Sequence, residues 1–506
     1  MSGWEPVIGI EVHVELSTQS KMFCGCAVSF GAEPNTNVCP VCLGLPGALP
    51  VPNRRAIEWI IAIGLALNCQ VSERSVFHRK NYFYADLPKN YQISQFDVPV
   101  CHDGHLDVVV DEQSTRIGIE RAHMEEDTGK STHVGEGGRI HGAESTLLDF
   151  NRSGVPLVEI VSKPDVRSAV EARAYAQELR AVVAELGVSD ARLEEGSIRF
   201  DANVSVRQQG ADELGTKVEV KNMNSFRSLE RAVAFEIDRQ IQVLESDEDL
   251  IQETRHWDEE AGVTHAMRTK EGSSDYRYFT EPDLVPMMMD SEWVEEIRSR
   301  LPELPAERRS RYLDAGLDVY MAGVLSDSPA SLRRIFDDAV AAGAEPKAAA
   351  NWLTGEVTAW LRRTESDPGA VPLTGAQLAQ LVEIVDDGTV SSSAAKEVLE
   401  GVLDGEGDPR DVAEARDLVQ ISDTSELESV VDQVLDENPE AVVNYKEGEK
   451  KVLGFLVGQV MKATQGKADP KLVNQLLAKK LDSNSDFEGG RPPSNPPPGS
   501  ASSRQT

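Results

Sequence analysis

A strict alternation of apolar and polar residues opens the chain and limits what it can fold into. In PVIGIEVHVEL, residues 6–16, four apolar side chains fall on one face, and Glu11, His13 and Glu15 fall on the other. A period of two residues is typical of a strand with one buried face. HLDVVV, IRFDANVSV and TKVEVKNMN alternate likewise, which predicts a sheet with an apolar back and a polar front.

The pattern changes near residue 290. Before it, AIEWIIAIGLALN and SAVEARAYAQELRAVVAELG have the period and length of helices set among strands. After about residue 293 the chain is rich in Ala, Leu, Glu and Arg at helical spacing. A chain of 506 residues is too long to fold around a single hydrophobic core, so we expect an α+β fold in several parts. These are a sheet region at 1–292, helical regions at 293–345 and 346–482, and a disordered Pro/Ser-rich tail at 483–506.

Charge and hydropathy limit where the protein can be located and which partners it can bind. No apolar run approaches the roughly 20 residues that span a bilayer, and the first residues do not resemble a secretory signal. We therefore expect a cytoplasmic protein. The net charge of −34 argues against a generic nucleic-acid binder. Residues 445–481 are an exception, with eight lysines against three acids. They form either a solvated helix face or a surface for an anionic partner.

Four of the six cysteines lie close together in the sequence. Cys24 and Cys26 form a C-x-C pair, and after twelve intervening residues Cys39 and Cys42 form a C-x₂-C pair. Two tight thiol pairs match a closed tetrahedral zinc site, which leaves no open position for catalysis and is therefore structural. The alternative is four unrelated reduced thiols.

Three consecutive acids, Glu125, Glu126 and Asp127, come just before the sequence GKST. GKST is not the end of a P-loop, because Met124 stands where the first glycine is required and three carboxylates would repel the phosphates. The acids are instead hard oxygen ligands of the kind that Mg²⁺ prefers.

Further acids lie on the polar faces of the expected strands. The set comprises Glu11, Glu159, Asp201 and Glu219, with His13 beside Glu11. Each acid taken singly is better explained as part of a solvated strand face. Together they suit a Mg²⁺–nucleotide site built on a sheet. Basic residues nearby could hold the phosphates, namely Arg79, Lys80, Arg152 and Lys221.

Long strings of this sequence are similar, in order, to a known family. They include RKNYFYADLPKNYQISQ, HMEEDTGKSTH, DFNRSGVPLVEIVS, KVEVKNMNSF, DYRYFTEPDL and GFLVGQVMKATQGKADPKLVNQLL. They resemble the B subunits of bacterial tRNA-dependent amidotransferases, the GatB/GatE family, over about residues 4–481. The resemblance implies a glutamine-synthetase-like catalytic cradle, followed by a helical linker and a helical tail that contacts tRNA.

The resemblance also implies an activity, the formation of carbon–nitrogen bonds with glutamine as amido donor. Members of this family use Mg·ATP to phosphorylate the side-chain carboxylate of Glu-tRNA(Gln), of Asp-tRNA(Asn), or of both. Ammonia from a partner amidase, the A subunit, then displaces the phosphate, and a small C subunit completes a heterotrimer. Neither DNA nor a membrane is implied as a partner.

The family's site residues are carried over motif by motif. The implied catalytic set is Glu11, His13, Glu125, Glu126, Glu159, Asp201 and Glu219. The implied Mg²⁺ ligands within it are Glu11, His13, Glu125, Glu159 and Glu219. In the lysine-rich segment, the resemblance favours tRNA binding, with Lys462, Lys467 and Lys471 as contacts.

Two other functions are compatible with parts of the sequence. A free-standing ATP-dependent ligase for a small amino acid would use the acidic sheet and would not need the basic tail. A zinc-bearing scaffold that binds tRNA would use the tail without catalysis. ATP hydrolysis stimulated by misacylated tRNA separates such a scaffold from an enzyme.

Overall fold

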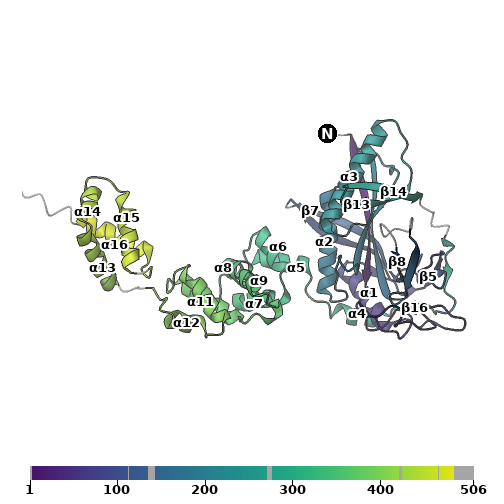
Figure 1. Ribbon diagram of the computed structural model, residues 1–506, viewed down its shortest axis with the longest axis horizontal. Coiled ribbons are helices and arrows are strands. Elements are labelled where there is room, and N and C mark those ends of the chain that lie inside the picture. The colour runs from purple at the N-terminus through teal and green to yellow at the C-terminus, as the bar shows by residue number, and fades with distance from the viewer. Residues whose placement is uncertain are drawn as a thin grey trace, which may run out of the picture. The chain divides into compact units, whose positions relative to one another are not determined.

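The chain divides into two compact units, Met1–Arg308 and Arg309–Thr506 (Figure 1). The computed structural model describes residues 3–111, 113–134, 143–269, 276–420, 424–464 and 466–483. The first unit combines sheets and helices, and the described part of the second is helical. The expected α+β class and the change to helices near residue 290 are thus confirmed. The glutamine-synthetase-like detail and the four-part division stay predictions, and residues 484–506 of the expected tail lie outside the described residues.

A nine-stranded sheet organises the first unit, in the order β14-β13-β12-β11-β1-β10-β7-β6-β2. Only the β12–β13 pair is parallel among these described strands. The strands are β1 (Trp4–Glu15), β2 (Gln70–Val71), β6 (Cys101–Val110), β7 (Gln113–Glu126), β10 (Pro156–Ser162), β11 (Ile198–Gln208), β12 (Val218–Lys221), β13 (Glu253–Asp258) and β14 (Val263–Thr269).

Three small sheets accompany the large one. They are β15-β4-β5, β16-β3 and β8-β9. Their bounds are β3 (Arg74–Ser75), β4 (His78–Asn81), β5 (Tyr91–Ser94), β8 (Lys130–Val134), β9 (Ser145–Asp149), β15 (Phe279–Thr280) and β16 (Met287–Met288). Strand β5 packs against β7 of the large sheet, so the small β4–β5 sheet stands beside the large sheet's polar strand ends.

Helices cover the apolar face of the large sheet. They are α1 (Arg54–Ala66), α2 (Ala169–Glu185) and α3 (Phe226–Glu245), with the shorter α4 (Ser291–Arg298) packed on α1. Asn53, Ser168 and Ser225 cap the three long helices by accepting hydrogen bonds from first-turn N–H groups. The alternation in β1 is confirmed: Ile8, Ile10, Val12 and Val14 are completely buried in the core that these helices share.

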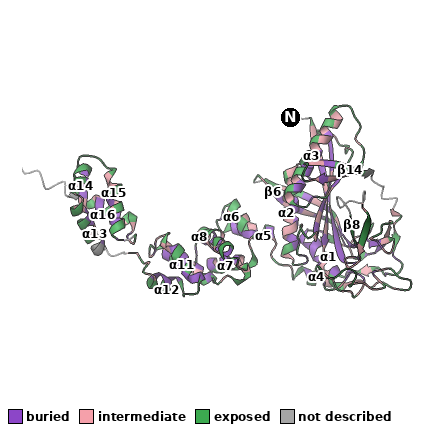
Figure 2. Cartoon of the chain, in the orientation of Figure 1, coloured by how far each residue is buried: buried purple, intermediate pink, exposed green. Residues whose placement is uncertain are grey.

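The second unit is built from short helices around two apolar clusters (Figure 2). One cluster spans residues 312–413 and the other spans 427–481. The helices are α5 (Pro305–Asp314), α6 (Val319–Ser326), α7 (Ala330–Ala341), α8 (Pro346–Trp352), the π-helix η2 (Leu353–Val357), α9 (Thr358–Thr364), the 3₁₀-helix η3 (Pro368–Ala370), α10 (Gly375–Asp386), α11 (Ala394–Leu403), α12 (Pro409–Ala415), α13 (Thr424–Glu437), α14 (Pro439–Lys446), α15 (Val452–Ala463) and α16 (Pro470–Ser483). None of the described helices is long and apolar enough to cross a membrane.

A close approach of α1 to β6 yields a test of the core. A Cβ added at Gly64 would lie 2.2 Å from Sγ of the buried Cys101. We expect Gly64→Ala to destabilise the protein by about 1–3 kcal/mol, because overpacking displaces neighbouring side chains. Thermal unfolding should show a lower midpoint. The matched control is Gly454→Ala in α15, where nothing lies within 4 Å, so its midpoint should not fall. Equal midpoints for the two variants would contradict this packing.

Candidate active site

The register of three central strands brings acids and imidazoles together on the polar face of the sheet. Strand β1 pairs with β11 on one side and β10 on the other. Glu11 lies opposite Asp201, and His13 lies opposite Glu159. Glu159 in turn lies opposite His123 of β7. Directly opposite residues share a face, so these side chains form adjacent rows, and a cavity of about 280 Å³ lies over them.

The first carboxylate cluster consists of His13, Glu125 and Glu159. One potential ligand atom from each lies within 4.8 Å of the other two. Nε2 of His13 is 3.6 Å from Glu159. Nζ of Lys80 is 3.4 Å from Glu125, and the Ser94 hydroxyl donates to the same carboxylate at 2.7 Å. The small β4–β5 sheet therefore supplies a cation and a hydroxyl to an acid of the large sheet.

The second carboxylate cluster consists of Glu11, Asp201 and Glu219, whose oxygens also lie within 4.8 Å of one another. Nζ of Lys221 is 2.7 Å from Asp201 and 3.4 Å from Glu219. The Asn203 amide donates to Glu11 at 2.8 Å. Three carboxylates around one lysine leave an excess of negative charge, and hard oxygen donors at this separation suit a divalent cation.

His123 is a site residue that the sequence reasoning missed. It is buried, and its Nε2 lies 3.4 Å from Glu125 and 3.3 Å from Glu159. Its Nδ1 has no hydrogen-bond partner within the described ranges. Burial opposes the charged imidazole, but Glu159 and Glu125 outweigh it and raise the pKa of His123 to about 9. Its position two residues before Glu125, on the same strand face, was the available signal.

The two buried glutamates of the first cluster stay ionised. Burial alone would raise the pKa of Glu125, but the Lys80 ammonium, with His123, lowers it to about 2. Burial likewise opposes ionisation of Glu159, and His123 and His13 hold its pKa well below the usual range. Both carboxylates are thus in the form that binds a cation or repels another anion.

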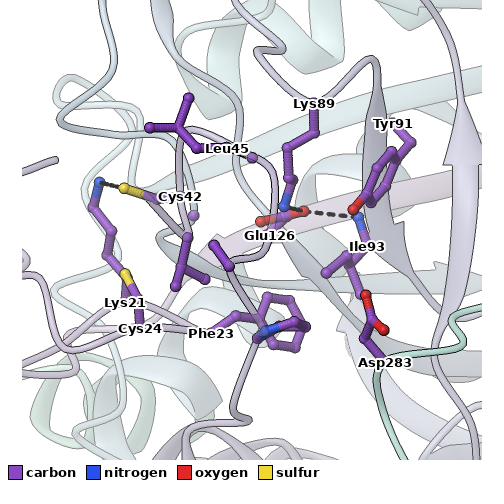
Figure 3. Close-up of a pocket in the computed structure, with 15 residues that line it drawn as sticks. Lys21, Phe23, Cys24, Cys42, Leu45, Lys89, Tyr91, Ile93, Glu126 and Asp283 are labelled. Carbon is purple, nitrogen blue, oxygen red and sulfur yellow. Dashed lines mark hydrogen bonds and ion pairs between the residues drawn. The ribbon is translucent and has the colours of Figure 1, made fainter. Parts of the chain in front are cut away.

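Glu126 does not share the cavity with Glu125. Consecutive strand residues point to opposite faces, and Glu126 pairs with Lys89 and accepts a hydrogen bond from the Ile93 N–H at 2.9 Å. Glu126 and Lys89 line a smaller cavity of about 110 Å³, which Cys42 also lines; Figure 3 shows these lining residues. Of the seven residues of the expected catalytic set, the structure separates this one from the other six.

Of the four basic residues expected to hold phosphates, two lie at the cavity and two do not. Lys80 and Lys221 line the cavity. Arg79 points elsewhere and forms a double hydrogen bond with Glu281 at 2.6 and 2.8 Å. Arg152 lies 2.6 Å from both Glu15 and Asp127. Neither arginine lines this cavity, and each has its charge matched by carboxylates.

The four clustered cysteines converge in space. The sulfurs of Cys24, Cys26, Cys39 and Cys42 all lie within 4.8 Å of one another. A tetrahedral zinc with bonds of about 2.3 Å would place them roughly 3.8 Å apart, so the donor set fits. A hydrogen bond from the Cys24 thiol lowers the pKa of Cys42 to about 4 against the effect of burial, and the Cys39 N–H and Lys21 add to this. Nζ of Lys21 is 3.7 Å from Sγ of Cys42 (Figure 3).

The three lysines expected to contact tRNA lie near the junction of α15 and α16. Lys462 is in the last turn of α15 and Lys471 is in the first turn of α16, and both are exposed. Lys467 lies between the helices and forms an ion pair with Asp417. Two of the three charges are therefore open to solvent.

Comparison with known proteins identifies the family. The family description "GatB/GatE catalytic domain" matches residues 6–295, and "GatB domain" matches residues 334–481. The chain belongs to the GatB/GatE family, as the sequence motifs predicted. A similar protein from Moorella thermoacetica is 53% identical over 480 residues, covering 94% of this chain and 100% of its own. One from Carboxydothermus hydrogenoformans is 51% identical over 482 residues, covering 95% and 99%. Both are named as the B subunit of an aspartyl/glutamyl-tRNA(Asn/Gln) amidotransferase.

The cysteine geometry generates a prediction. We expect the purified protein to contain one zinc, and Cys39→Ser to lower the yield of folded protein more than the specific activity of what survives. The reason is that a four-thiolate site stabilises the fold and offers no open coordination position. Metal analysis and thiol titration check this. A protein without zinc, with four freely titratable thiols, would contradict it.

Proposed function

We propose that this chain activates the side-chain carboxylate of Glu-tRNA(Gln), of Asp-tRNA(Asn), or of both, by ATP-dependent phosphorylation. Ammonia delivered from a partner amidase then converts the activated group to the amide. The chain would act as one member of a complex with that amidase and a small third protein. The names of its relatives, which include both tRNAs and identify those proteins as the B subunit of a larger enzyme, support this assignment.

The observation that carries the proposal is the pairing of two carboxylate clusters with two lysines over one cavity. Phosphoryl transfer to a carboxylate requires positioning and charge neutralisation, because the nucleophile is already an anion. His13, Glu125 and Glu159 would hold one Mg²⁺, and Glu11, Asp201 and Glu219 would hold another. When bound, these ions supply charge neutralisation at the phosphates.

The chemistry proceeds in two steps. In the first, an oxygen of the substrate carboxylate forms a bond to the γ-phosphorus of ATP, and the bond to the β-phosphate oxygen breaks to release ADP. Lys80 and Lys221 would orient the phosphates by charge, because the neighbouring carboxylates outweigh burial, raise the pKa values of both ammonium groups and keep them protonated. In the second, ammonia attacks the acyl carbon, phosphate leaves with the bonding electrons, and a proton is lost to give the amide.

The buried carboxylate Glu125 provides the most direct test. Glu125→Gln keeps the shape of the side chain but removes its charge, so tRNA-dependent ATP hydrolysis and amide formation should fall about 10²–10³-fold. The purified complex would be assayed for both activities. Glutaminase activity, which belongs to the partner amidase, should largely persist.

Ser131→Ala is the matched control for this substitution. Ser131 lies exposed in β8, opposite Leu148 and outside the cavity, so its loss should have little effect. In a true P-loop this hydroxyl would ligate Mg²⁺ and its removal would be severe. An inactive Ser131→Ala together with an active Glu125→Gln would reverse the assignment.

The lysine-rich segment generates a separate prediction for tRNA binding. Changing Lys462, Lys467 and Lys471 to Glu should weaken tRNA binding and leave ATP binding intact. Each lost phosphate contact should reduce the slope of log affinity against log salt by about 1. Affinity measured over a range of salt concentrations tests this. An unchanged slope would mean that these lysines form only a solvated helix face.

A further inference from the structure

Six aromatic side chains connect the cavity with the protein surface. Two segments far apart in the sequence supply this aromatic cluster, which consists of Tyr82, Phe83, Tyr84, Phe96, Tyr276 and Tyr278. Ring contacts join five of them, and Phe83 belongs to the cluster through its place in the chain between Tyr82 and Tyr84. Phe96, Tyr276 and Tyr278 line the 280 Å³ cavity itself. The mechanism proposed above assigns a task to none of them.

The rings form a continuous series that leads out of the cavity. The centroid of Tyr278 is 6.0 Å from that of Tyr276, which is 6.0 Å from that of Tyr82. The ring centroid of Tyr82 is 5.8 Å from that of Tyr84, and Tyr84 is 48% exposed. Phe96 stacks on Tyr278 at 4.5 Å with an angle of 14° between the planes.

Two phenylalanines of the aromatic cluster are more exposed than their chemistry favours. Phe83 is 69% exposed and Phe96 is 49% exposed. Single exposed apolar residues are ordinary, but exposed rings within a series of aromatic side chains that leads from a cavity mark a binding surface. The Arg277 guanidinium lies 6.0 Å from the centre of the Phe83 ring and adds positive charge beside it. Aromatic rings next to a cation match the surfaces that bind unpaired nucleotides, where bases stack and phosphates meet positive charge.

We infer that the aromatic cluster binds the single-stranded 3′ end of the aminoacyl-tRNA by base stacking. This inference rests on the proposed function. The amino acid is esterified to the terminal ribose, so a side-chain carboxylate placed at the acidic clusters puts the last bases at the cavity mouth. Phe96 and Tyr278 line the cavity at that position. Tyr82 and Tyr84 continue the series of ring contacts outward and would meet the preceding nucleotides of the tRNA.

Two substitutions test the inference in the purified complex. Phe96→Leu and Phe83→Leu keep the apolar character but remove the aromatic face. Each should lower kcat/KM for misacylated tRNA roughly tenfold, as expected for one lost base stack, and leave the KM for ATP unchanged. The matched control is Phe30→Leu, at a residue that is 83% exposed and outside the cluster, which should behave as the unsubstituted protein.

Binding measurements separate this inference from the proposed function. The unsubstituted complex should bind full-length tRNA more tightly than tRNA lacking its unpaired 3′ nucleotides. In Phe96→Leu this difference should shrink by the same factor, and the truncated tRNA should bind both proteins equally. If Phe96→Leu matches Phe30→Leu in every assay, or if only the KM for ATP rises, base stacking of the tRNA end is overturned. A complex that shows the binding difference but forms no amide overturns the proposed function alone.

Discussion

The antiparallel pairing of β1 with its two neighbours is the constraint on which the rest of the structure depends. The register sets Glu11 against Asp201 and His13 against Glu159. Side chains alternate with a period of two, so a shift of β1 by one residue would turn Glu11 and His13 into the core. The apolar partners Ile8, Ile10, Val12 and Val14, completely buried on the other face, prevent such a shift. Hydrophobic burial thereby fixes the positions of the ionised groups.

Concentrating carboxylates at the centre of a sheet has an electrostatic cost. Like charges repel, and burial penalises each ionised form. Lys80, Lys221, His13 and His123 offset this cost in the first unit. Glu125 and Glu159 therefore remain ionised, and the second cluster sets three carboxyl groups against one lysine. A site with more acidic than basic groups suits a cation, whereas a fully matched set of ion pairs would not.

Much of the first unit could be predicted from the sequence, because strand alternation and cysteine spacing are local signals. They indicated the polar face of β1, the helices α1 and α2, and the four converging thiols. Arg79 points away from the cavity because it pairs with Glu281. That residue is 202 positions away in the sequence, so no local pattern shows the contact. The aromatic cluster likewise joins two distant segments. The position of Glu126 was missed for a different reason. Adjacent acids look equivalent in a sequence, and they point to opposite faces only once they belong to a strand.

Because Glu125 and Glu126 point to opposite faces of β7, this single strand separates two cavities. On one side it borders the cavity with Lys80 and His123, and on the other it borders the smaller space with Lys89 and Cys42. Inserting or deleting a single residue upstream in this strand would exchange the two acids between compartments. Length changes of two residues would preserve the side on which each acid lies. The chain can therefore vary in the loops at either end of β7 far more freely than within the strand itself.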